Sequence, residues 1–148
     1  MKIEDFEAKK YSKIIALKDK GNNKSKIILN ANNTTFYLVE FDKVCDQSHG
    51  QRCDFVLYKN DKNVVLFADP KGNDISEAVE QILNSKELLK DSFSNSVKYA
   101  AISYSGSPLS TEVQNGKIKL MKKGFKESFI TSTQLELSYK DGKIIKSG

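Results

Sequence analysis

Three ionisable side chains stand out in two apolar segments, residues 53–58 and 64–72. Asp54 lies in the first segment, and Asp69 and Lys71 stand two residues apart at the end of the second. A carboxylate inside a strand is costly unless it has a partner or a metal ion. Two carboxylates and an amine are the groups that hold a magnesium ion and a water molecule against a phosphodiester. We therefore take Asp54, Asp69 and Lys71 as the candidate catalytic residues.

The convergence of these residues depends on a predicted β-hairpin. Residues 59–62 supply the turn between the two apolar segments. With a symmetric loop of two or four residues, Asp54 would lie opposite Phe67 and diagonal to Asp69. Because side chains alternate along a strand, Asp54, Asp69 and Lys71 would then share one face of the hairpin. A slip of one residue would send Asp54 to the other face.

The best-defined helix follows the hairpin. Asp74 is a good N-cap, Glu77 completes a capping box, and an apolar stripe begins at Ile75. Gln81 lies on the border of that stripe. A strand at 99–104 comes next, so the segment 64–104 predicts a right-handed crossover between two parallel strands.

The remaining elements are shorter. We expect a helix at 3–18, strands at 27–29 and 36–42, and a basic helix from about Thr111. Short strands are expected at 129–131, 134–139 and 144–145, with a hairpin turn at Asp141 and Gly142. These patterns predict one domain over residues 1–148, in the mixed α/β (α+β-like) class. It would have a single central mixed sheet, antiparallel outside the crossover pair, with flanking helices.

The order of elements and motifs resembles the PD-(D/E)XK nuclease superfamily, which has the restriction-endonuclease-like fold with an αβββαβ core. Three short motifs carry the resemblance: residues 52–55 (RCDF), 69–74 (DPKGND) and 78–82 (AVEQI). They are similar to a group of small bacterial proteins with a CD…ELKGxD…AxEQ pattern. Asp69 replaces the usual glutamate, and Pro70 replaces the usual apolar residue. Because proline cannot donate to a strand ladder, the sheet edge would bend or end there.

The resemblance implies a site and an activity. Asp54, Asp69 and the Pro70 carbonyl would hold Mg²⁺, for which Mn²⁺ would substitute. Lys71 would position or deprotonate the attacking water, and Gln81 would hold a phosphate or that water. The implied activity is endonucleolytic hydrolysis of nucleic acid, DNA rather than RNA, in restriction, repair or defence.

The charge distribution bears on the partner. The net charge is +5, which is consistent with a polyanionic partner. A lysine cluster consists of Lys117, Lys119, Lys122, Lys123 and Lys126. Either a phosphate-binding patch or a solvated helix face accounts for this cluster. A homodimer or a protein partner would supply sequence specificity, since 148 residues leave little room for a separate reading module.

A second interpretation stays open for the site. Asp54, Asp69 and Lys71 would also fit a buried ion cluster in a catalytically silent nuclease-fold binding protein, such as an immunity protein or toxin inhibitor. Gln81 would then make only a local hydrogen bond. The auxiliary acids to consider are Glu4, Glu7, Glu40 and Asp42.

Other functional classes lack support in the sequence. No apolar run approaches a membrane span, and the charged residues 1–5 lack the apolar stretch of a signal peptide, so we expect a cytoplasmic protein. Cys45 and Cys53 are expected to be reduced, buried thiols. His49 is the only histidine, which argues against a zinc site or a Ser-His-Asp triad.

Overall fold

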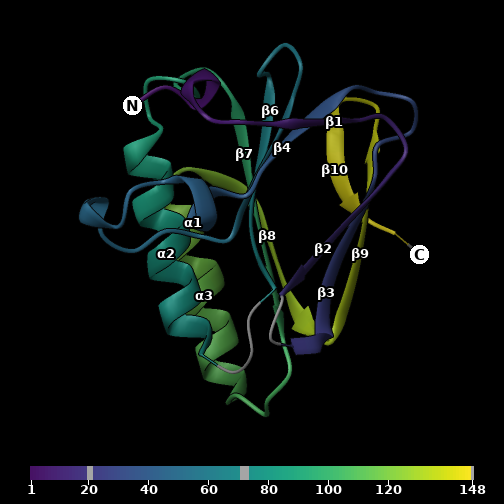
Figure 1. The fold of residues 1–148 in the computed structure, drawn as a ribbon. Helices are drawn as coiled ribbons and strands as arrows, with labels where there is room; N and C mark the ends of the chain where they lie inside the picture. Colours follow the sequence, from purple (N-terminus) through teal and green to yellow (C-terminus); the bar gives the residue numbers. More distant parts are fainter. Residues whose placement is uncertain (20–21, 71–73, 148) are drawn as a thin grey trace.

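The computed structural model describes residues 1–19, 22–70 and 74–147. It shows a mixed α/β fold with a large central mixed sheet, as the sequence predicts. Figure 1 shows α2 and α3 on one face of this sheet and a second sheet on the other face. The elements in chain order are η1 (Ile3–Asp5), β1 (Lys9–Tyr11), β2 (Ile14–Asp19), β3 (Asn22–Asn30), β4 (Phe36–Val39), α1 (Phe41–Val44), η2 (Gln47–His49), β5 (Phe55–Lys59), β6 (Val64–Pro70), α2 (Ile75–Leu88), β7 (Val97–Tyr104), α3 (Ser110–Lys122), β8 (Phe125–Ser132), β9 (Gln134–Lys140) and β10 (Lys143–Lys146).

The central sheet has the strand order β1-β4-β5-β6-β7-β8. Strands β4, β5 and β6 form an antiparallel meander, and α2 connects β6 to the parallel strand β7. The crossover predicted for residues 64–104 is therefore confirmed. The expectation that the rest of the sheet is antiparallel is wrong for β8, which pairs in parallel with β7 because α3 makes a second crossover.

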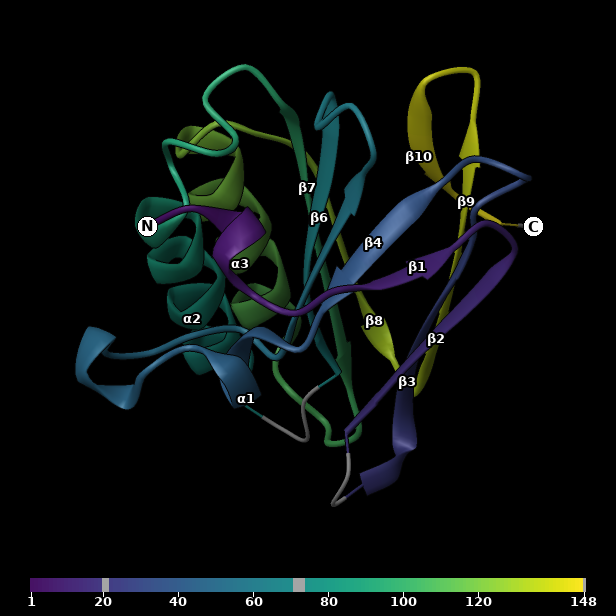
Figure 2. The same ribbon diagram turned by 45° about the horizontal axis from the view of Figure 1, so that its top comes forward.

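The second sheet has the order β10-β9-β3-β2 and was not anticipated. Figure 2 shows it facing the central sheet as the second layer of a sandwich. Its central pair, β3 and β9, is parallel although the strands lie far apart in the chain. Hydrophobic side chains such as Leu29, Leu66 and Leu137 fill the space between the two sheets.

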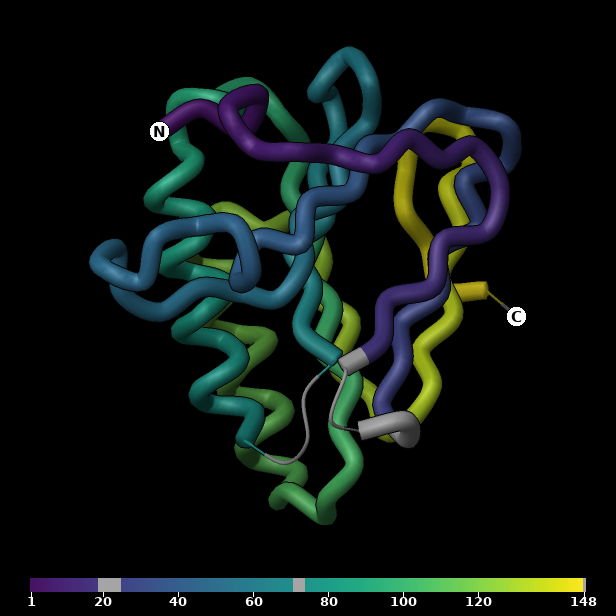
Figure 3. Tube along the Cα trace, viewed as in Figure 1, coloured from purple at the N-terminus to yellow at the C-terminus, as the bar shows by residue number. Residues whose placement is uncertain are grey.

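The helix expected at 3–18 is wrong. This segment forms η1, β1 and β2 instead. In β2 the burial alternates, because Ile15 and Leu17 are buried while Ile14 and Ala16 are exposed, and this is the period of a strand. Figure 3 shows the chain passing from β1, in the central sheet, to β2, at the edge of the second sheet.

The two long helices form as the sequence predicts. The Asp74 carboxylate caps α2 by accepting a hydrogen bond from the backbone N–H of Glu77 at 2.9 Å. Helix α3 packs beside α2, where a Cβ added at Gly116 would lie 3.2 Å from Cγ2 of Val79. Gly116 therefore allows the close approach of the two helices. None of the helices in the described ranges carries an apolar stretch of membrane-spanning length.

Candidate functional site

The β5–β6 hairpin determines where the two acids lie. Val56 pairs with Phe67, so the expectation that Asp54 lies opposite Phe67 is wrong by two residues. The physical reason is that the four-residue loop occupies 60–63, one residue later than expected. Continuing the register by two residues sets Asp54 in line with Asp69. Because a shift of two keeps every side chain on its face, the two acids still share a face.

That shared face is the one covered by the helices. Val65 and Phe67 pack in the core beneath α2 and α3, whereas Leu66, between them in the strand, points to the other face. Asp69 is two residues after Phe67 and so points to the same side. It is fully buried, whereas Asp54, which directly precedes β5, is half-buried.

The carboxylate of Asp69 contacts the backbone of Asp54 directly. Its Oδ1 accepts a hydrogen bond from the Asp54 N–H at 2.8 Å. The side chain of one acid thereby fixes the position of the other at the end of the hairpin. This bond is stabilising, since a buried carboxylate needs donors to compensate for the loss of water.

A chain of hydrogen bonds connects this end of the hairpin to α2. The Cys53 N–H donates to Oγ of Ser85 at 2.8 Å, and the Ser85 hydroxyl donates to the backbone carbonyl of Gln81 at 2.8 Å. Ser85 is fully buried. The sequence analysis missed Ser85; the available signal was its spacing of four residues from Gln81, which places both on one helix face.

Gln81 is a buried amide on α2, with 9% of its surface exposed. Its Nε2 donates to Oε1 of Glu77 at 3.2 Å. Its Oε1 is buried, and no residue in the described ranges donates to it. Gln81 therefore makes the local hydrogen bond and also presents an additional acceptor.

The pKa of the Cys53 thiol reflects its burial and the negative charge of the two nearby acids. Burial raises the pKa of its thiol well above the usual range, and the nearby carboxylates of Asp69 and, to a smaller extent, Asp54 raise it further. Both carboxylates therefore lie close enough to influence the same sulfur. Both cysteines are free and buried, as expected.

Two members of the candidate set remain to be placed. Pro70 is buried and pairs with Ser103 of β7 at the end of β6. Lys71 lies outside the described residues.

The described residues offer two carboxylates as metal ligands. Mg²⁺ prefers oxygen ligands and keeps several waters, so one or two carboxylates suffice, and Asp54 and Asp69 fit it in ligand type. Within residues 1–19, 22–70 and 74–147, no three His, Cys, Asp or Glu side chains gather closely enough to hold a metal ion.

The lysine cluster is divided between two surfaces. Lys119 and Lys123 line a hollow with His49 and Asn84, and Lys119 forms an ion pair with Glu80. Lys117 lines a different hollow, between β8 and β10. Lys122 is exposed on α3 and Lys126 on β8. Neither of these two hollows includes Asp54 or Asp69.

Two of the auxiliary acids, Glu4 and Asp42, form ion pairs with basic residues. Glu4 pairs with Lys62 at 2.7 Å, and this bond lowers the pKa of Glu4. Asp42 pairs with the buried Arg52 at 3.0 Å. That pair fixes the segment leading into β5.

Glu7 and Glu40 line another hollow, between the two sheets.

No family model, curated protein or solved structure matches the chain.

Proposed function

We propose that this protein is a metal-dependent phosphodiesterase that cleaves nucleic acid, DNA rather than RNA, with a site of the PD-(D/E)XK type. The observation that supports the proposal most is the pairing of Asp54 and Asp69. They lie in line at the end of two neighbouring strands, on one face, with the carboxylate of Asp69 bonded to the backbone of Asp54. A buried carboxylate such as that of Asp69 is usually paired or coordinates a metal ion, and such acids cluster at functional sites.

The residues take distinct roles in this proposal. Asp54 and Asp69, with the Pro70 carbonyl, would hold Mg²⁺, which when bound supplies a Lewis acid and lowers the pKa of a water. Asp69 also positions Asp54 through the backbone hydrogen bond. From its spacing in the sequence, Lys71 would orient the attacking water or stabilise negative charge. Gln81, with its buried Oε1, would hold that water.

A second candidate is a nuclease-fold binding protein without activity. The observation that favours it is the complete burial of Asp69 together with its backbone hydrogen bond, which is also what a purely structural acid would show. In that case the ion pair of Lys119 with Glu80 would belong to a folded surface and not to a phosphate-binding patch.

A cleavage assay separates the two candidates. Supercoiled plasmid, single-stranded DNA and RNA are incubated with the protein in Mg²⁺, in Mn²⁺ and in EDTA. We expect metal-dependent cleavage that falls at least about 100-fold in Asp69→Asn, which keeps the shape of the side chain and removes its charge. The matched control is Asp61→Asn, because Asp61 lies in the loop of the same hairpin and pairs with Lys59 at the surface.

The variant Lys71→Ala should lose activity to a similar extent. If the pure wild-type protein cleaves none of the three substrates with either metal, the catalytic proposal is rejected in favour of the binding protein. Equal activity of Asp69→Asn and Asp61→Asn would reject the proposed site and point to a contaminating nuclease.

A further inference from the structure

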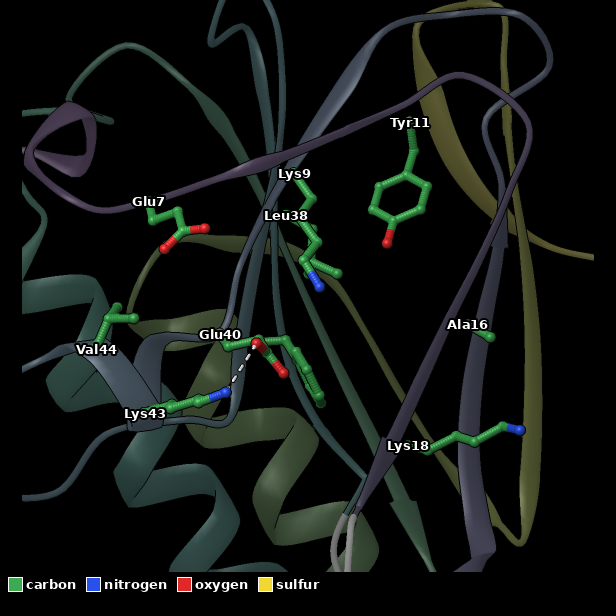
Figure 4. A pocket seen from close by; sticks show the side chains of 10 residues that line it. Glu7, Lys9, Tyr11, Ala16, Lys18, Leu38, Glu40, Lys43 and Val44 are labelled. Carbon is green, nitrogen blue, oxygen red and sulfur yellow. Dashed lines mark ion pairs between the residues drawn. The ribbon is translucent and has the colours of Figure 1, made fainter.

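A hollow opens between the two sheets, on the side where β1 passes to β2. Its volume is about 510 Å³, within the range of small-molecule and nucleotide pockets. Figure 4 shows its lining side chains, with the Lys9 ammonium and the Tyr11 hydroxyl directed into the hollow from β1. Lys18 lines the hollow from β2, and in Figure 4 its side chain extends past β3, away from the Lys9 ammonium.

The floor of this hollow is apolar and aromatic. Leu38 and Phe55 line it from neighbouring strands of the central sheet, and Tyr11 adds a half-buried ring at the sheet edge. Tyr11 also packs against the core between the two sheets, which limits the freedom of its ring. Aromatic rings held in this way provide surfaces on which a nucleobase stacks.

The rim carries an excess of positive charge. Lys43 is matched by Glu40, whose carboxylate lies 3.9 Å from the ammonium group. Lys9 and Lys18 form no ion pair with any residue in the described ranges, and Glu7 is the one other acid lining the hollow. Two ammonium groups that have no partner among the described residues, beside an aromatic floor, suit a ligand that has both a phosphate and a planar ring.

The hollow and the proposed catalytic acids lie on opposite faces of the central sheet, at the same end of β5. Phe55 lines the hollow and Asp54 is the residue before it, so the two side chains point to opposite faces at the same end of β5. A chain bound in the hollow would need only to cross the end of the sheet to reach Asp54 and Asp69. A continuous, flexible ligand makes that crossing, whereas a stiff duplex does not.

We propose that this hollow binds one nucleotide unit of a single-stranded nucleic acid and guides the strand toward Asp54 and Asp69; the second half of this proposal rests on the proposed function. A base stacks on Tyr11 and Phe55, and the flanking phosphates contact Lys9 and Lys18. The substrate of the proposed site is then a single strand or a frayed end, not an intact duplex.

The test measures binding without cleavage. Fluorescence anisotropy of labelled single-stranded oligonucleotides is recorded in EDTA over a range of salt concentrations. In Lys9→Gln/Lys18→Gln we expect binding about tenfold weaker and a log–log salt slope smaller by about 1.4, since each phosphate contact on a single strand contributes about 0.7. In Tyr11→Leu we expect weaker binding by about fivefold or more, with an unchanged salt slope.

The control removes the same charge from the same segment. Lys10→Gln/Lys13→Gln alters two exposed lysines that do not line the hollow. It should bind nearly as well as the wild-type protein. If the control loses as much affinity as Lys9→Gln/Lys18→Gln, if duplex DNA binds as tightly as single strands, or if polyglutamate displaces the oligonucleotide equally well, the hollow is not a nucleotide site.

Failure of this proposal is distinguishable from failure of the proposed function. Binding that depends on Lys9, Lys18 and Tyr11 but is followed by no cleavage in Mg²⁺ or Mn²⁺ would reject only the catalytic proposal. Metal-dependent cleavage of single strands that is unchanged in both hollow variants, Lys9→Gln/Lys18→Gln and Tyr11→Leu, would reject only the hollow.

Discussion

At the scale of single residues, Asp69 has a structural role that is separable from its proposed chemistry. Its carboxylate accepts the hydrogen bond of the Asp54 N–H inside the core. We predict that Asp69→Ala lowers the free energy of unfolding by about 1–3 kcal/mol, because it leaves that N–H without its acceptor. Asp69→Asn keeps an acceptor oxygen and should cost less. Urea unfolding of the two variants measures the difference.

The contrast between these variants is informative in both directions. If alanine and asparagine destabilise equally, the backbone hydrogen bond contributes nothing and the burial of Asp69 needs another explanation. If asparagine folds well but lacks activity, the charge of Asp69 serves the reaction and not the fold.

Tyr99 gives the protein a defined sensitivity to alkaline pH. Burial raises the pKa of its hydroxyl above the usual value of about 10. In the unfolded chain the hydroxyl ionises first, so its contribution to stability is fully present below pH 10 and is lost as the pH rises toward the folded-state pKa. We predict that Tyr99→Phe loses less stability between pH 10 and 11 than the wild-type protein, by at most about 1.4 kcal/mol per pH unit. Urea unfolding at each pH measures both slopes, and identical slopes would contradict the prediction.

The sequence was sufficient to predict that Asp54 and Asp69 share one face of the hairpin. It was not sufficient to predict the exact register of the two strands. Because side chains alternate along a strand, a shift of the register by an even number of residues leaves Asp54 and Asp69 on the same face. The predicted register was wrong by two residues, so the prediction of a shared face still holds. Turn residues around Asp61 do not by themselves decide where a four-residue loop begins. The contact of Ser85 with Cys53 joins segments 32 residues apart and leaves no local pattern.

At the scale of elements, the packing of α2 against α3 depends on the absence of a side chain at Gly116. A Cβ there would lie 3.2 Å from Val79 and 3.4 Å from Ile130. We predict that Gly116→Val lowers the free energy of unfolding by about 1–3 kcal/mol through overpacking. The control Gln114→Val places the same residue on the exposed side of α3 and should cost about 0.5 kcal/mol through helix propensity alone. Equal losses would show that the two helices can separate to accommodate the added atoms.

Elements with local signals were predicted correctly, and so were the strand segments 27–29 and 134–139, which lie in β3 and β9; the N-terminal segment and the pairing of these strands into a second sheet were not. α2 has an N-cap at Asp74 and an apolar stripe, so its start was evident. In the N-terminal segment, Ile14, Ile15 and Leu17 fit a helical spacing as well as an alternating one. The segment 14–19 is a strand and not a helix because β2 pairs with β3. The parallel pairing of β3 with β9 then completes the second sheet. A single sequence contains no short-range pattern for such long-range pairs.

At the scale of the whole molecule, a bound metal ion should stabilise the fold. A ligand that binds only the native state adds about 2.7 kcal/mol at 100 times its Kd. For a chain of this size each kcal/mol raises Tm by about 2–4 °C. We therefore predict that saturating Mg²⁺ or Mn²⁺ raises Tm by several degrees in the wild-type protein and not in Asp54→Asn. Differential scanning calorimetry with K⁺ at matched ionic strength provides the control, and an equal rise in both proteins would place the ion elsewhere.

The layered architecture places the two proposed sites on opposite faces of the central sheet. The helix-covered face of the central sheet holds Asp54 and Asp69, and the opposite face, between the sheets, holds the hollow lined by Lys9 and Tyr11. The net charge of +5 favours a polyanion for the molecule as a whole. The lysines of α3 point to other surfaces and would add only salt-dependent, unspecific attraction.

The central claim is that Asp54 and Asp69 hold one divalent cation, and crystals soaked in manganese test it most directly. Anomalous scattering locates Mn²⁺ without any assumption about activity. We predict a single strong anomalous peak within coordination distance of one carboxylate oxygen from each residue, at about 2.0–2.3 Å, and no such peak in crystals of Asp54→Asn. A wild-type map with no peak between these two side chains would contradict the account.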